Sequence, residues 1–506
     1  MSGFRAYATA VAVHYSGTLL SILASLLLTR QAYQQLGAER IGEWFMLLQL
    51  TGFLPLLELG AFALCAREVA TGMGTGDRSR ALGAARARRR QALLLWPALI
   101  ACSAGVLLVV SRSRPDLLPA FATILVANAL AYPLRYAVSV LQGLQDLTFL
   151  GVATLASTLL GIAAGIGLLH LGWAIEALAA SWAIQQLLGL AVSTLRVTVR
   201  HGPEWLVGGP PGPRAPGFWS RGAAVSGSSL LHTLMNGSDA LMVGSLLGSG
   251  SATALAATSR LPGIAGMLGS TMTQVAVPRV ARAHGEDPRE GASREALRLA
   301  FLAMSVTGAL AVGIGAVNGV FVSLWLREEV YAGAAVSAAV LLHLVLRQGL
   351  TSLGVGLLGR AMDHISLATA ALEVALFLAL VPLALRWSGS VLALPLVQCL
   401  LGTGLLLLRL RLLTPEGGWG PGASRLVLLS FSTAAMVSAS VGLPGLVFSR
   451  GRGWGELAAL ALLSCALVGV QVLLTRALLR SCPEGRSLLT DLGGLRTSSL
   501  TRRARV

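Results

Sequence analysis

The chain contains no lysine and little charge of any kind. Its 39 basic residues are all arginines, and charged residues make up only 12% of the 506 positions. Soluble globular proteins carry about 25% charged residues. This low charge, together with 55% hydrophobic residues and a mean hydropathy of +0.73, excludes an ordinary soluble domain. The composition predicts a protein embedded in lipid.

Cysteine is also scarce, and motifs for catalysis or metal binding are absent from the sequence. The five cysteines form no CxxC or CxxH spacing, so neither a metal site nor a disulfide framework is expected. The chain carries no Walker A, HExxH or GxSxG pattern, which argues against an ATP motor and against two common hydrolase types. We therefore expect no catalytic residues, no metal and no cofactor.

Long apolar runs dominate what is present. Runs of helix length indicate membrane-spanning helices, because barrel strands would alternate over about 10 residues. The sequence thus predicts an all-α integral membrane protein with about fourteen transmembrane helices. The expected spans are 9–29, 42–65, 92–110, 120–141, 149–169, 177–195, 222–247, 254–277, 297–318, 333–358, 365–385, 391–408, 426–447 and 456–479.

The arginines gather in alternate connections between these spans. The stretch from Arg67 to Arg90 holds seven of them, and others cluster at 196–221, 279–298 and in the C-terminal tail. Cytoplasmic loops of membrane proteins are enriched in basic residues. This pattern predicts that both termini are cytoplasmic, and it accounts for the positive charge without a nucleic-acid partner.

A Pro/Gly-rich stretch divides the predicted helices. Residues 201–221 cannot continue a helix and separate an N-terminal six-helix bundle, 1–200, from a C-terminal six-helix bundle, 222–412. Two extra helices, 413–480, and a basic cytoplasmic tail, 481–506, follow. With six helices per half, the halves insert in the same orientation, and a pseudo-twofold axis would run along the membrane normal.

An offset of 211 residues relates the two predicted halves. Leu36-Gly37, after the first helix, matches Leu247-Gly248, after the seventh. Polar residues follow one face of each of these two helices. We interpret these faces as lining a water-filled cavity, with tight helix packing as the alternative. The stripes consist of His14, Thr18, Ser21 and Ser25 in the first helix and Ser229, His232, Asn236 and Asp239 in the seventh.

Few charges fall inside the spans, and each is costly there, by about 2.5–3.5 kcal/mol at a helix centre. Arg135, Arg260 and Arg347 are candidates for binding an anion, since a guanidinium binds phosphate oxygens with two hydrogen bonds. Snorkelling of Arg135 and an ion pair between Arg260 and Asp239 are the alternatives.

Two carboxylates, Glu58 and Glu373, also lie inside the predicted spans. They are candidates for coupling to a Na⁺ or H⁺ gradient, because intramembrane carboxylates serve in proton and cation relays. Structural ion pairs are the competing interpretation for both.

Several short motifs resemble the O-antigen and polysaccharide flippases. In that family a Leu-Gly…Tyr-Gly-Ile-Trp element opens the second helix and a Leu-Asp-Leu-Gly element lies near its end. Residues 36–44 (LGAERIGEW) and 54–60 (LPLLELG) are similar to these elements. The chain departs from the pattern at Ile41, where tyrosine is usual, and at Glu58, where aspartate is usual.

The resemblance continues into the second half. Asp239, followed by Val243-Gly244 and Leu247-Gly248, resembles the family's seventh helix, and Arg260-Leu261 and Pro278 resemble its eighth. A tyrosine that the family carries before this arginine is missing. Arg30 matches the arginine that precedes the family's first Leu-Gly and joins the candidate binding residues on that ground.

The resemblance implies the fold of the multidrug/oligosaccharidyl-lipid/polysaccharide (MOP) exporters, which is shared with the MATE transporters. The implied substrate is an oligosaccharide on a polyprenyl diphosphate, an O-antigen or exopolysaccharide repeat unit, moved to the periplasmic leaflet of a bacterial inner membrane by alternating access. Membrane lipids and other glycan-assembly proteins are the implied partners.

Three alternatives stay open. A lipid II flippase and a cation-coupled drug antiporter would share the fold, although a drug antiporter should have an acidic cavity. A membrane-embedded glycan polymerase or ligase is the alternative of another class. Such an enzyme should carry a sizeable outward-facing loop with catalytic residues, which the sequence lacks.

Overall fold

The computed structural model describes residues 2–51, 61–74, 76–206, 237–267, 290–360, 362–413, 421–447 and 454–480, with isolated positions between them such as Glu58. Every regular element in these residues is a helix. Ten of the helices are long and apolar enough to cross a membrane. The predicted all-α membrane fold is therefore confirmed.

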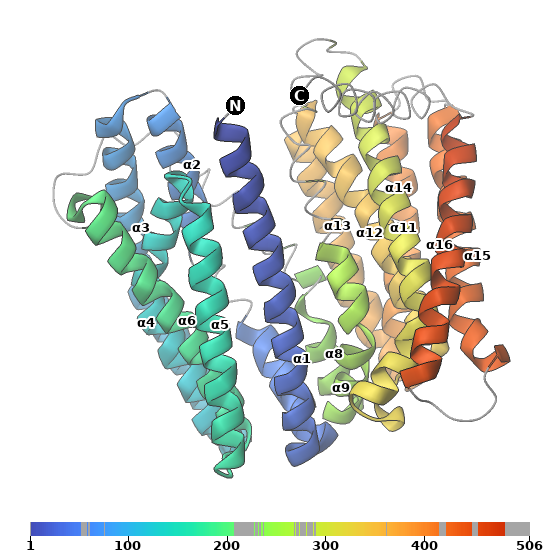
Figure 1. Ribbon diagram of the computed structural model, residues 1–506, viewed down its shortest axis with the longest axis horizontal. Coiled ribbons are helices and arrows are strands. Elements are labelled where there is room, and N and C mark those ends of the chain that lie inside the picture. The colour runs from blue at the N-terminus through green and yellow to red at the C-terminus, as the bar shows by residue number, and fades with distance from the viewer. Residues whose placement is uncertain are drawn as a thin grey trace, which may run out of the picture. The chain divides into compact units, whose positions relative to one another are not determined.

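The chain divides into two compact units, Met1–Leu241 and Met242–Val506 (Figure 1). Most of the predicted linker, from 207 to 221, lies outside the described residues, as does the predicted tail. The helices of the first unit are α1 (Ser2–Thr51), α2 (Ala61–Gly74), α3 (Arg78–Ser113), α4 (Leu118–Gly143), α5 (Leu147–His170) and α6 (Ile175–Arg196). Those that follow are α8 (Asp239–Leu247), α9 (Ser249–Thr258), α11 (Gly291–Trp325), α12 (Ala334–Gly359), α13 (Asp363–Ser388), α14 (Ala393–Leu413), α15 (Pro421–Val447) and α16 (Trp454–Arg480).

The first two predicted spans are joined differently from the prediction. We expected separate helices at 9–29 and 42–65, whereas α1 runs from Ser2 to Thr51 with a kink at Gly37. Gly37 has φ 80° and ψ 176°, a conformation that is essentially restricted to glycine. Gly248, its counterpart under the 211-residue offset, also has a positive φ, of 96°. The same backbone break thus occurs at both Leu-Gly steps.

Helix α3 is longer than its predicted span of 92–110. It begins at Arg78, so most of the arginine-rich stretch that we expected to be a loop is helical. Asp77 caps this helix by accepting a hydrogen bond from the Arg80 amide at 2.9 Å. That bond and one from the Ser79 hydroxyl lower the pKa of the Asp77 carboxyl. Alanine and arginine are strong helix formers, and with this cap they extend the helix beyond its apolar part.

In the first unit, α4, α5 and α6 pack against one another and α1 packs on α5. Gly161 permits the contact between α5 and α6, because a Cβ there would come within 2.7 Å of the Ser181 carbonyl oxygen. The Ser181 hydroxyl donates to the Gly161 carbonyl at 2.8 Å. Small residues at helix contacts of this kind are the usual basis of packing in lipid.

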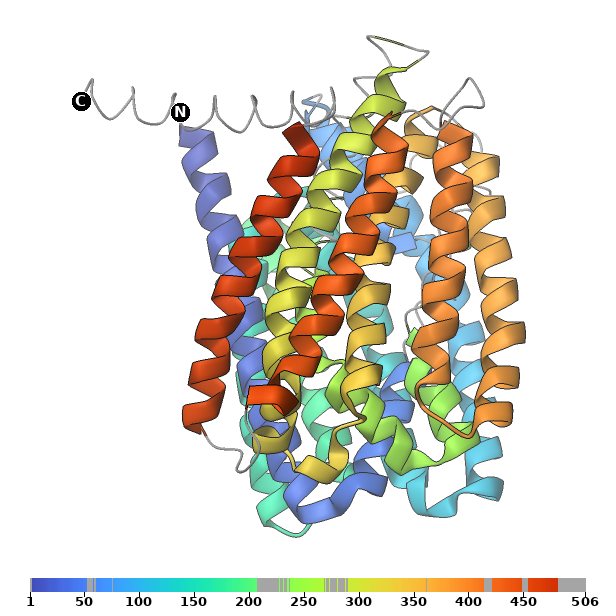
Figure 2. The same ribbon diagram turned by 90° about the vertical axis from the view of Figure 1, so that its right-hand side faces the viewer.

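The second unit is built around α11, which packs against α12, α15 and α16 (Figure 2). Its core includes Phe301 and Met304 from α11, Leu353 from α12 and Leu429 from α15, all buried. The two C-terminal helices, expected as extras to a six-helix bundle, therefore share the hydrophobic core of this unit.

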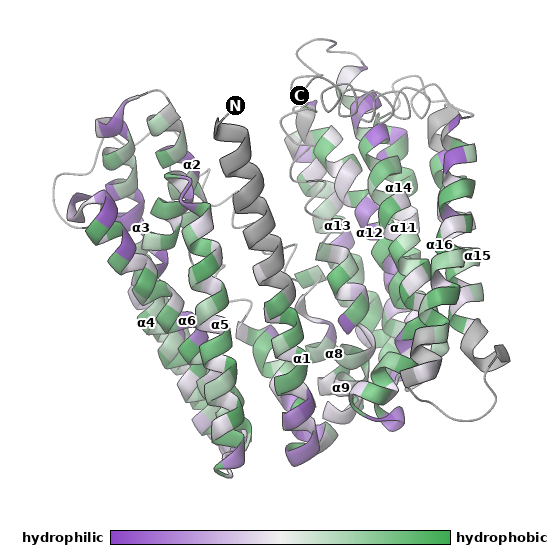
Figure 3. Cartoon of the chain, viewed as in Figure 1, coloured by the Kyte–Doolittle hydropathy of each residue, from purple (hydrophilic) through white to green (hydrophobic). Residues whose placement is uncertain are grey.

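Apolar side chains also cover the outside of the helices. Hydrophobic residues extend along much of the coloured part of the helices in both units (Figure 3). On α3, Leu94 and Val109 are 58% and 63% exposed, and on α14 Leu400 is 69% exposed. Exposed apolar surface on so many long helices is expected where lipid, and not water, is the solvent. The chain is thus a multi-pass membrane protein.

Candidate functional site

The two carboxylates predicted inside the spans are each bound to a predicted arginine. In the first unit, the Arg135 guanidinium on α4 donates to Glu58 Oε1 at 2.6 Å through Nη1 and to Asn128 Oδ1 at 2.9 Å through Nη2. Asn128 lies two turns before Arg135 on the same face of α4. Arg135 is thus held at two points within its own bundle. An ion pair was the competing interpretation for Glu58, but the sequence analysis did not identify Arg135 as its partner.

The second unit contains the matching pair. Arg347 Nη1 on α12 donates to Glu373 Oε1 on α13 at 2.5 Å, and the side chains are 16% and 4% exposed. Arg347 stands 212 residues after Arg135, one residue from the offset of the Leu-Gly steps. Each half therefore carries one intramembrane arginine at nearly the same place, and each is paired with a glutamate of its own unit.

A third arginine, Arg409, was missed by the sequence analysis. The predicted span ended at 408, whereas α14 continues to Leu413 and buries Arg409 to 6% exposure. Its Nη1 donates to the Leu350 carbonyl on α12 at 2.8 Å. The helical spacing of the sequence could have identified Arg409 as buried. Arg409 lies on the same buried face of α14 as Gln398, Gly402 and Leu405, at intervals of three or four residues.

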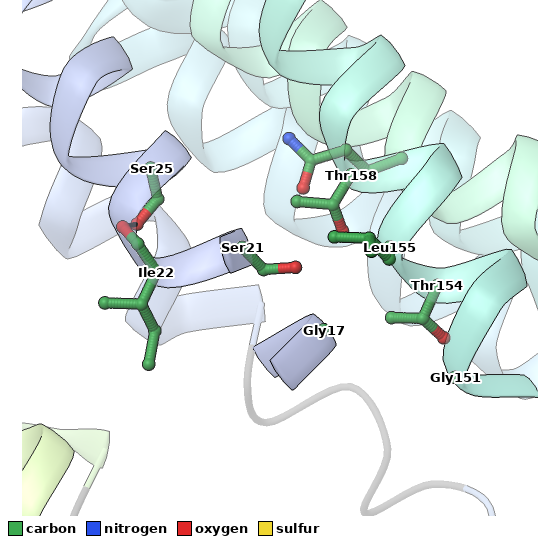
Figure 4. Close-up of a pocket in the computed structure, with 9 residues that line it drawn as sticks. Gly17, Ser21, Ile22, Ser25, Gly151, Thr154, Leu155 and Thr158 are labelled. Atoms are coloured by element: carbon green, nitrogen blue, oxygen red, sulfur yellow. Dashed lines mark hydrogen bonds between the residues drawn. The ribbon is translucent and has the colours of Figure 1, made fainter. Parts of the chain in front are cut away.

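Part of the polar stripe on α1 lines a pocket inside the first unit. Ser21 of α1 points toward Thr154 and Thr158 of α5 (Figure 4). Ser25 also lines the pocket, and its hydroxyl donates to the Ile22 carbonyl at 2.7 Å. The pocket has a volume of about 320 Å³, and Gln185 of α6 completes its polar lining. Ser21 and Ser25 thus line this pocket, and the assignment of this face of α1 to a transport cavity stays a prediction. His14 lies on α1, but its side chain is outside the described part of the structure.

The remaining predicted residues are placed less completely. Arg30 is exposed on α1, Asp239 begins α8, and Arg260 lies in a helical stretch that follows α9. Asp239 and Arg260 both take part in interactions within the protein. His232 and Asn236 lie outside the described residues, so the stripe on the seventh predicted helix stays a prediction.

Charged residues outside the spans form ion pairs between helices at each end of the first unit. At one end, Arg78 on α3 binds Glu204, which follows α6, at 2.6 Å. The neighbouring Trp205 is buried, and its carbonyl accepts a hydrogen bond from the Tyr136 hydroxyl at 2.9 Å. The first residues of the predicted linker therefore pack on this bundle.

At the same end, Asp146 accepts a hydrogen bond from Arg196 Nε at 2.9 Å and lies 3.4 Å from His201 Nε2. Partial burial opposes ionisation of Asp146, but these two partners outweigh it and lower the pKa of its carboxyl.

The opposite end of the first unit carries a second ion-pair network. Arg40, just past the kink of α1, binds Asp116 at 2.7 Å and Glu43 at 2.9 Å. Arg114, at the end of α3, also contacts Glu43 and Asp116. Arg78 and Arg196, from the arginine-rich connections, therefore lie at one end of this bundle, and Arg40 and Arg114 lie at the other.

These side chains can bind anions and polar groups. A buried guanidinium offers five N–H donors in a planar fork that matches phosphate oxygens. Serine, threonine and glutamine side chains offer neutral donors and acceptors of the kind that hydroxylated ligands need. In the part of the chain that the structure describes, no group of three or more His, Cys, Asp or Glu residues is arranged to hold a metal ion.

Known proteins share this fold. An inward-facing multidrug resistance MATE family transporter of the MOP superfamily matches with a TM-score of 0.60 and 14% identity, over 84% of this chain and 99% of that one. The lipid II flippase MurJ, in an inward closed conformation, matches with a TM-score of 0.61 and 10% identity, over 92% and 98%. At such identities the likeness concerns the fold. A direct search of curated proteins finds no significant match.

One sequence family also matches. Residues 115–328 fit the family model described as polysaccharide biosynthesis protein. This segment includes Arg135, Asp239 and Arg260, and it crosses the boundary between the two units. The chain thus has the MOP-superfamily fold and matches the polysaccharide biosynthesis proteins over residues 115–328, which confirms its resemblance to the polysaccharide flippases of that superfamily.

Proposed function

We propose that the chain is a flippase that moves a polyprenyl-diphosphate-linked oligosaccharide from the cytoplasmic to the periplasmic leaflet of a bacterial inner membrane. The match of residues 115–328 to polysaccharide biosynthesis proteins, within a MOP fold, is the observation that carries this proposal. The sugar would be an O-antigen or exopolysaccharide repeat unit, handed on to other glycan-assembly proteins.

The proposed binding groups follow from the chemistry of this substrate. Its diphosphate is anionic, and Arg30, Arg135, Arg260 and Arg347 are the candidate cations. Arg347 is the strongest of the four, because it lies near the middle of α12, where its guanidinium cannot reach the interface. The hydroxyl-lined pocket with Ser21 and Ser25 is a candidate site for neutral parts of the substrate.

Coupling to a Na⁺ or H⁺ gradient is part of the proposal. The candidate coupling residues are His14, Glu58, His232, Asn236, Asp239 and Glu373. Because Glu58 and Glu373 are ion-paired, exchange of a cation at either carboxylate requires its arginine to move away or to find another anion. Asp239, at the start of α8, is the remaining acidic candidate.

A lipid II flippase is the second candidate, favoured by the MurJ fold match over 92% of this chain. Its substrate is also a polyprenyl diphosphate, so both candidates need an anion site. A drug/cation antiporter, suggested by the MATE match, would need an acidic site for its cationic cargo. The arginines that neutralise Glu58 and Glu373 argue against such a site.

Translocation in proteoliposomes tests the proposal. Fluorescent polyprenyl-diphosphate oligosaccharide, lipid II and a cationic dye are loaded in parallel, and exposure to an impermeant quencher is followed with and without Na⁺ and H⁺ gradients. We expect the oligosaccharide lipid to move, and Arg347→Ala to slow it at least about tenfold, since a charge-assisted hydrogen bond is worth about 1.5–3 kcal/mol.

Arg386→Ala, at the exposed C-terminal end of α13, is the matched control and should transport normally. Size-exclusion chromatography establishes that each variant is folded. Transport of lipid II or the dye in place of the oligosaccharide lipid would contradict the proposed substrate, and a normal rate in Arg347→Ala would remove that arginine from the mechanism.

A further inference from the structure

Three charged side chains are largely buried near one another inside the second unit. Arg347 comes from α12, Glu373 from α13 and Arg409 from α14. Arg347 and Glu373 form the 2.5 Å pair, and Arg409 is close enough to both to interact with them electrostatically. Two guanidiniums and one carboxylate leave one positive charge uncompensated. Apart from Asp363, which opens α13, Glu373 is the only carboxylate in these three helices.

The direction of Arg409 is unexpected for an arginine near the end of a span. It stands four residues before the end of α14, within reach of the interface, where arginines usually extend their charge towards water. Its guanidinium instead crosses to α12 and donates to the Leu350 carbonyl, three residues beyond Arg347. The fold therefore buries a second positive charge within the bundle, against the helix that carries Arg347.

The hydrogen-bonding capacity of this cluster is only partly used. Nε of Arg347 and Nε of Arg409 are both buried without a hydrogen-bond partner in the described residues. Arg135 in the first unit differs, because Glu58 and Asn128 bind both of its terminal nitrogens. Buried donors without partners are uncommon in proteins and call for an explanation such as a bound ion.

From this geometry we infer that Arg347 and Arg409 form a diphosphate-binding site within the second unit, and that Glu373 is the resting counter-ion that the phosphate displaces. This inference deepens the proposed function by naming the half of the molecule that holds the diphosphate. Arg347 keeps 16% of its side-chain surface exposed and is the point of entry, and the more deeply buried Arg409 supplies the second charge.

The exchange gives Glu373 a definite role. A diphosphate oxygen replaces the carboxylate at Arg347 Nη1, so the arginine stays neutralised throughout. The displaced carboxylate is then buried without its cation, which is unfavourable in a low-dielectric interior. This penalty weakens anion binding and favours return of the carboxylate when the substrate leaves. Glu373 is therefore a positioning residue that competes with the substrate.

The test measures binding of inorganic pyrophosphate and of farnesyl diphosphate to the purified full-length protein in detergent, by calorimetry and by the rise in Tm. Arg347→Gln and Arg409→Gln should each weaken binding about tenfold or more, because each removes charge-assisted hydrogen bonds. Glu373→Gln should lower Tm without ligand yet tighten binding about tenfold. Arg411→Gln, the exposed arginine two residues along α14, is the matched control and should bind as wild type does.

The opposite movement of stability and affinity in Glu373→Gln distinguishes a displaced counter-ion from a purely structural salt bridge, whose loss would weaken both. Glu373→Asp, with its carboxylate drawn back by one methylene, repeats the test if the glutamine variant does not fold. Binding no tighter than wild type in both variants would overturn the counter-ion role. Unchanged binding in Arg409→Gln would overturn the two-arginine site.

The two probes separate the source of the anion. Farnesyl diphosphate binding more tightly than pyrophosphate indicates a lipid-linked ligand, whereas equal affinities indicate a site for the free anion. Failure of this site is distinguishable from failure of the proposed function. If the oligosaccharide lipid is translocated but no diphosphate binds at Arg347 and Arg409, the protein is a flippase and the proposed site is wrong. If diphosphate binds there but the oligosaccharide lipid is not translocated, the site binds anions in a transporter of another substrate.

Discussion

At the scale of single residues, Gly37 and Gly248 show how one backbone requirement recurs in both halves. Their φ angles are 80° and 96°, and a Cβ built on either would meet no atom within 4 Å. Space is therefore not what requires glycine at these positions. The requirement comes from the backbone conformation itself, which residues with a side chain rarely adopt.

Gly37→Ala and Gly248→Ala should therefore each destabilise the protein by about 1–3 kcal/mol. Gly105→Ala on α3 and Gly250→Ala on α9 are the controls, since both sites are open and lack the positive φ, and alanine is the better helix former. Thermal unfolding in detergent compares the four variants. An equal effect at all four positions would show that the two kinks impose no backbone constraint.

The same scale shows where sequence reasoning stops. The intramembrane positions of Arg135, Glu58, Arg347 and Glu373 follow from the apolar runs around them, because charge inside a span is conspicuous. Their pairing does not, since Glu58 and Arg135 are 77 residues apart and meet only when α4 packs into its bundle. The sequence analysis missed Arg409 because the apolar run ends at this first arginine, whereas helix α14 continues past it to Leu413.

At the scale of elements, the connections next to the spans are more ordered than their composition suggests. The predicted loop at 67–90 is largely α3, capped by Asp77 and joined to α2 by Arg88, whose guanidinium binds Glu68 at 2.6 Å. Hydropathy identifies where a helix leaves the lipid but carries no information on where it ends. Caps and ion pairs decide that, and they involve only one or two residues each.

The turn between α4 and α5 gives an element-scale prediction with a pH dependence. The pKa of Asp146 is lowered in the folded protein, chiefly by Arg196 and His201. A lowered carboxyl pKa contributes stability above the unfolded value of about 3.9, and that contribution is lost as the pH falls through the folded value. Wild type should therefore exceed Asp146→Asn in Tm at neutral pH.

The difference in Tm should persist down to about pH 4 and shrink below it, where the Asp146 carboxyl becomes protonated. Asp77→Asn, at the first turn of α3, serves as a control in the same unit, since its carboxyl is held by different partners. Thermal unfolding across a pH series measures both variants. A difference for Asp146→Asn that failed to shrink below about pH 4 would contradict a contribution from the ionised carboxylate.

At the scale of the whole molecule, the sequence predicted the fold class and roughly the number of spans, because a bilayer demands about 20 apolar residues per helix. It treated the last two helices as additions to a six-helix bundle. The structure includes them in the second unit, where Leu426 and Val441 of α15 belong to the hydrophobic core. Hydropathy cannot report this, since lipid-facing and protein-facing residues are equally apolar.

The contact between α11 and α15 depends on close approach of the helices. A Cβ at Gly315 would come within 2.3 Å of the Ser440 hydroxyl oxygen and 3.0 Å of Val441 Cγ2. Between α15 and α16, the Gln471 amide donates to the Thr433 hydroxyl at 2.9 Å, and both side chains are buried. In lipid such packing and hydrogen bonding are what hold helices together, because apolar burial alone gains little there.

We therefore expect Gly315→Val to destabilise the protein by about 1–3 kcal/mol, the usual effect of overpacking a close contact. Gly469→Val on α16, where nothing lies within 4 Å, should leave Tm nearly unchanged. A chain ending at Leu413 should fail to give a monodisperse protein, since α11 would lose α15 and α16, which both pack along it. If that shortened chain were as stable as the full one, α15 and α16 would be dispensable attachments, and the second unit would be complete in its first six predicted helices.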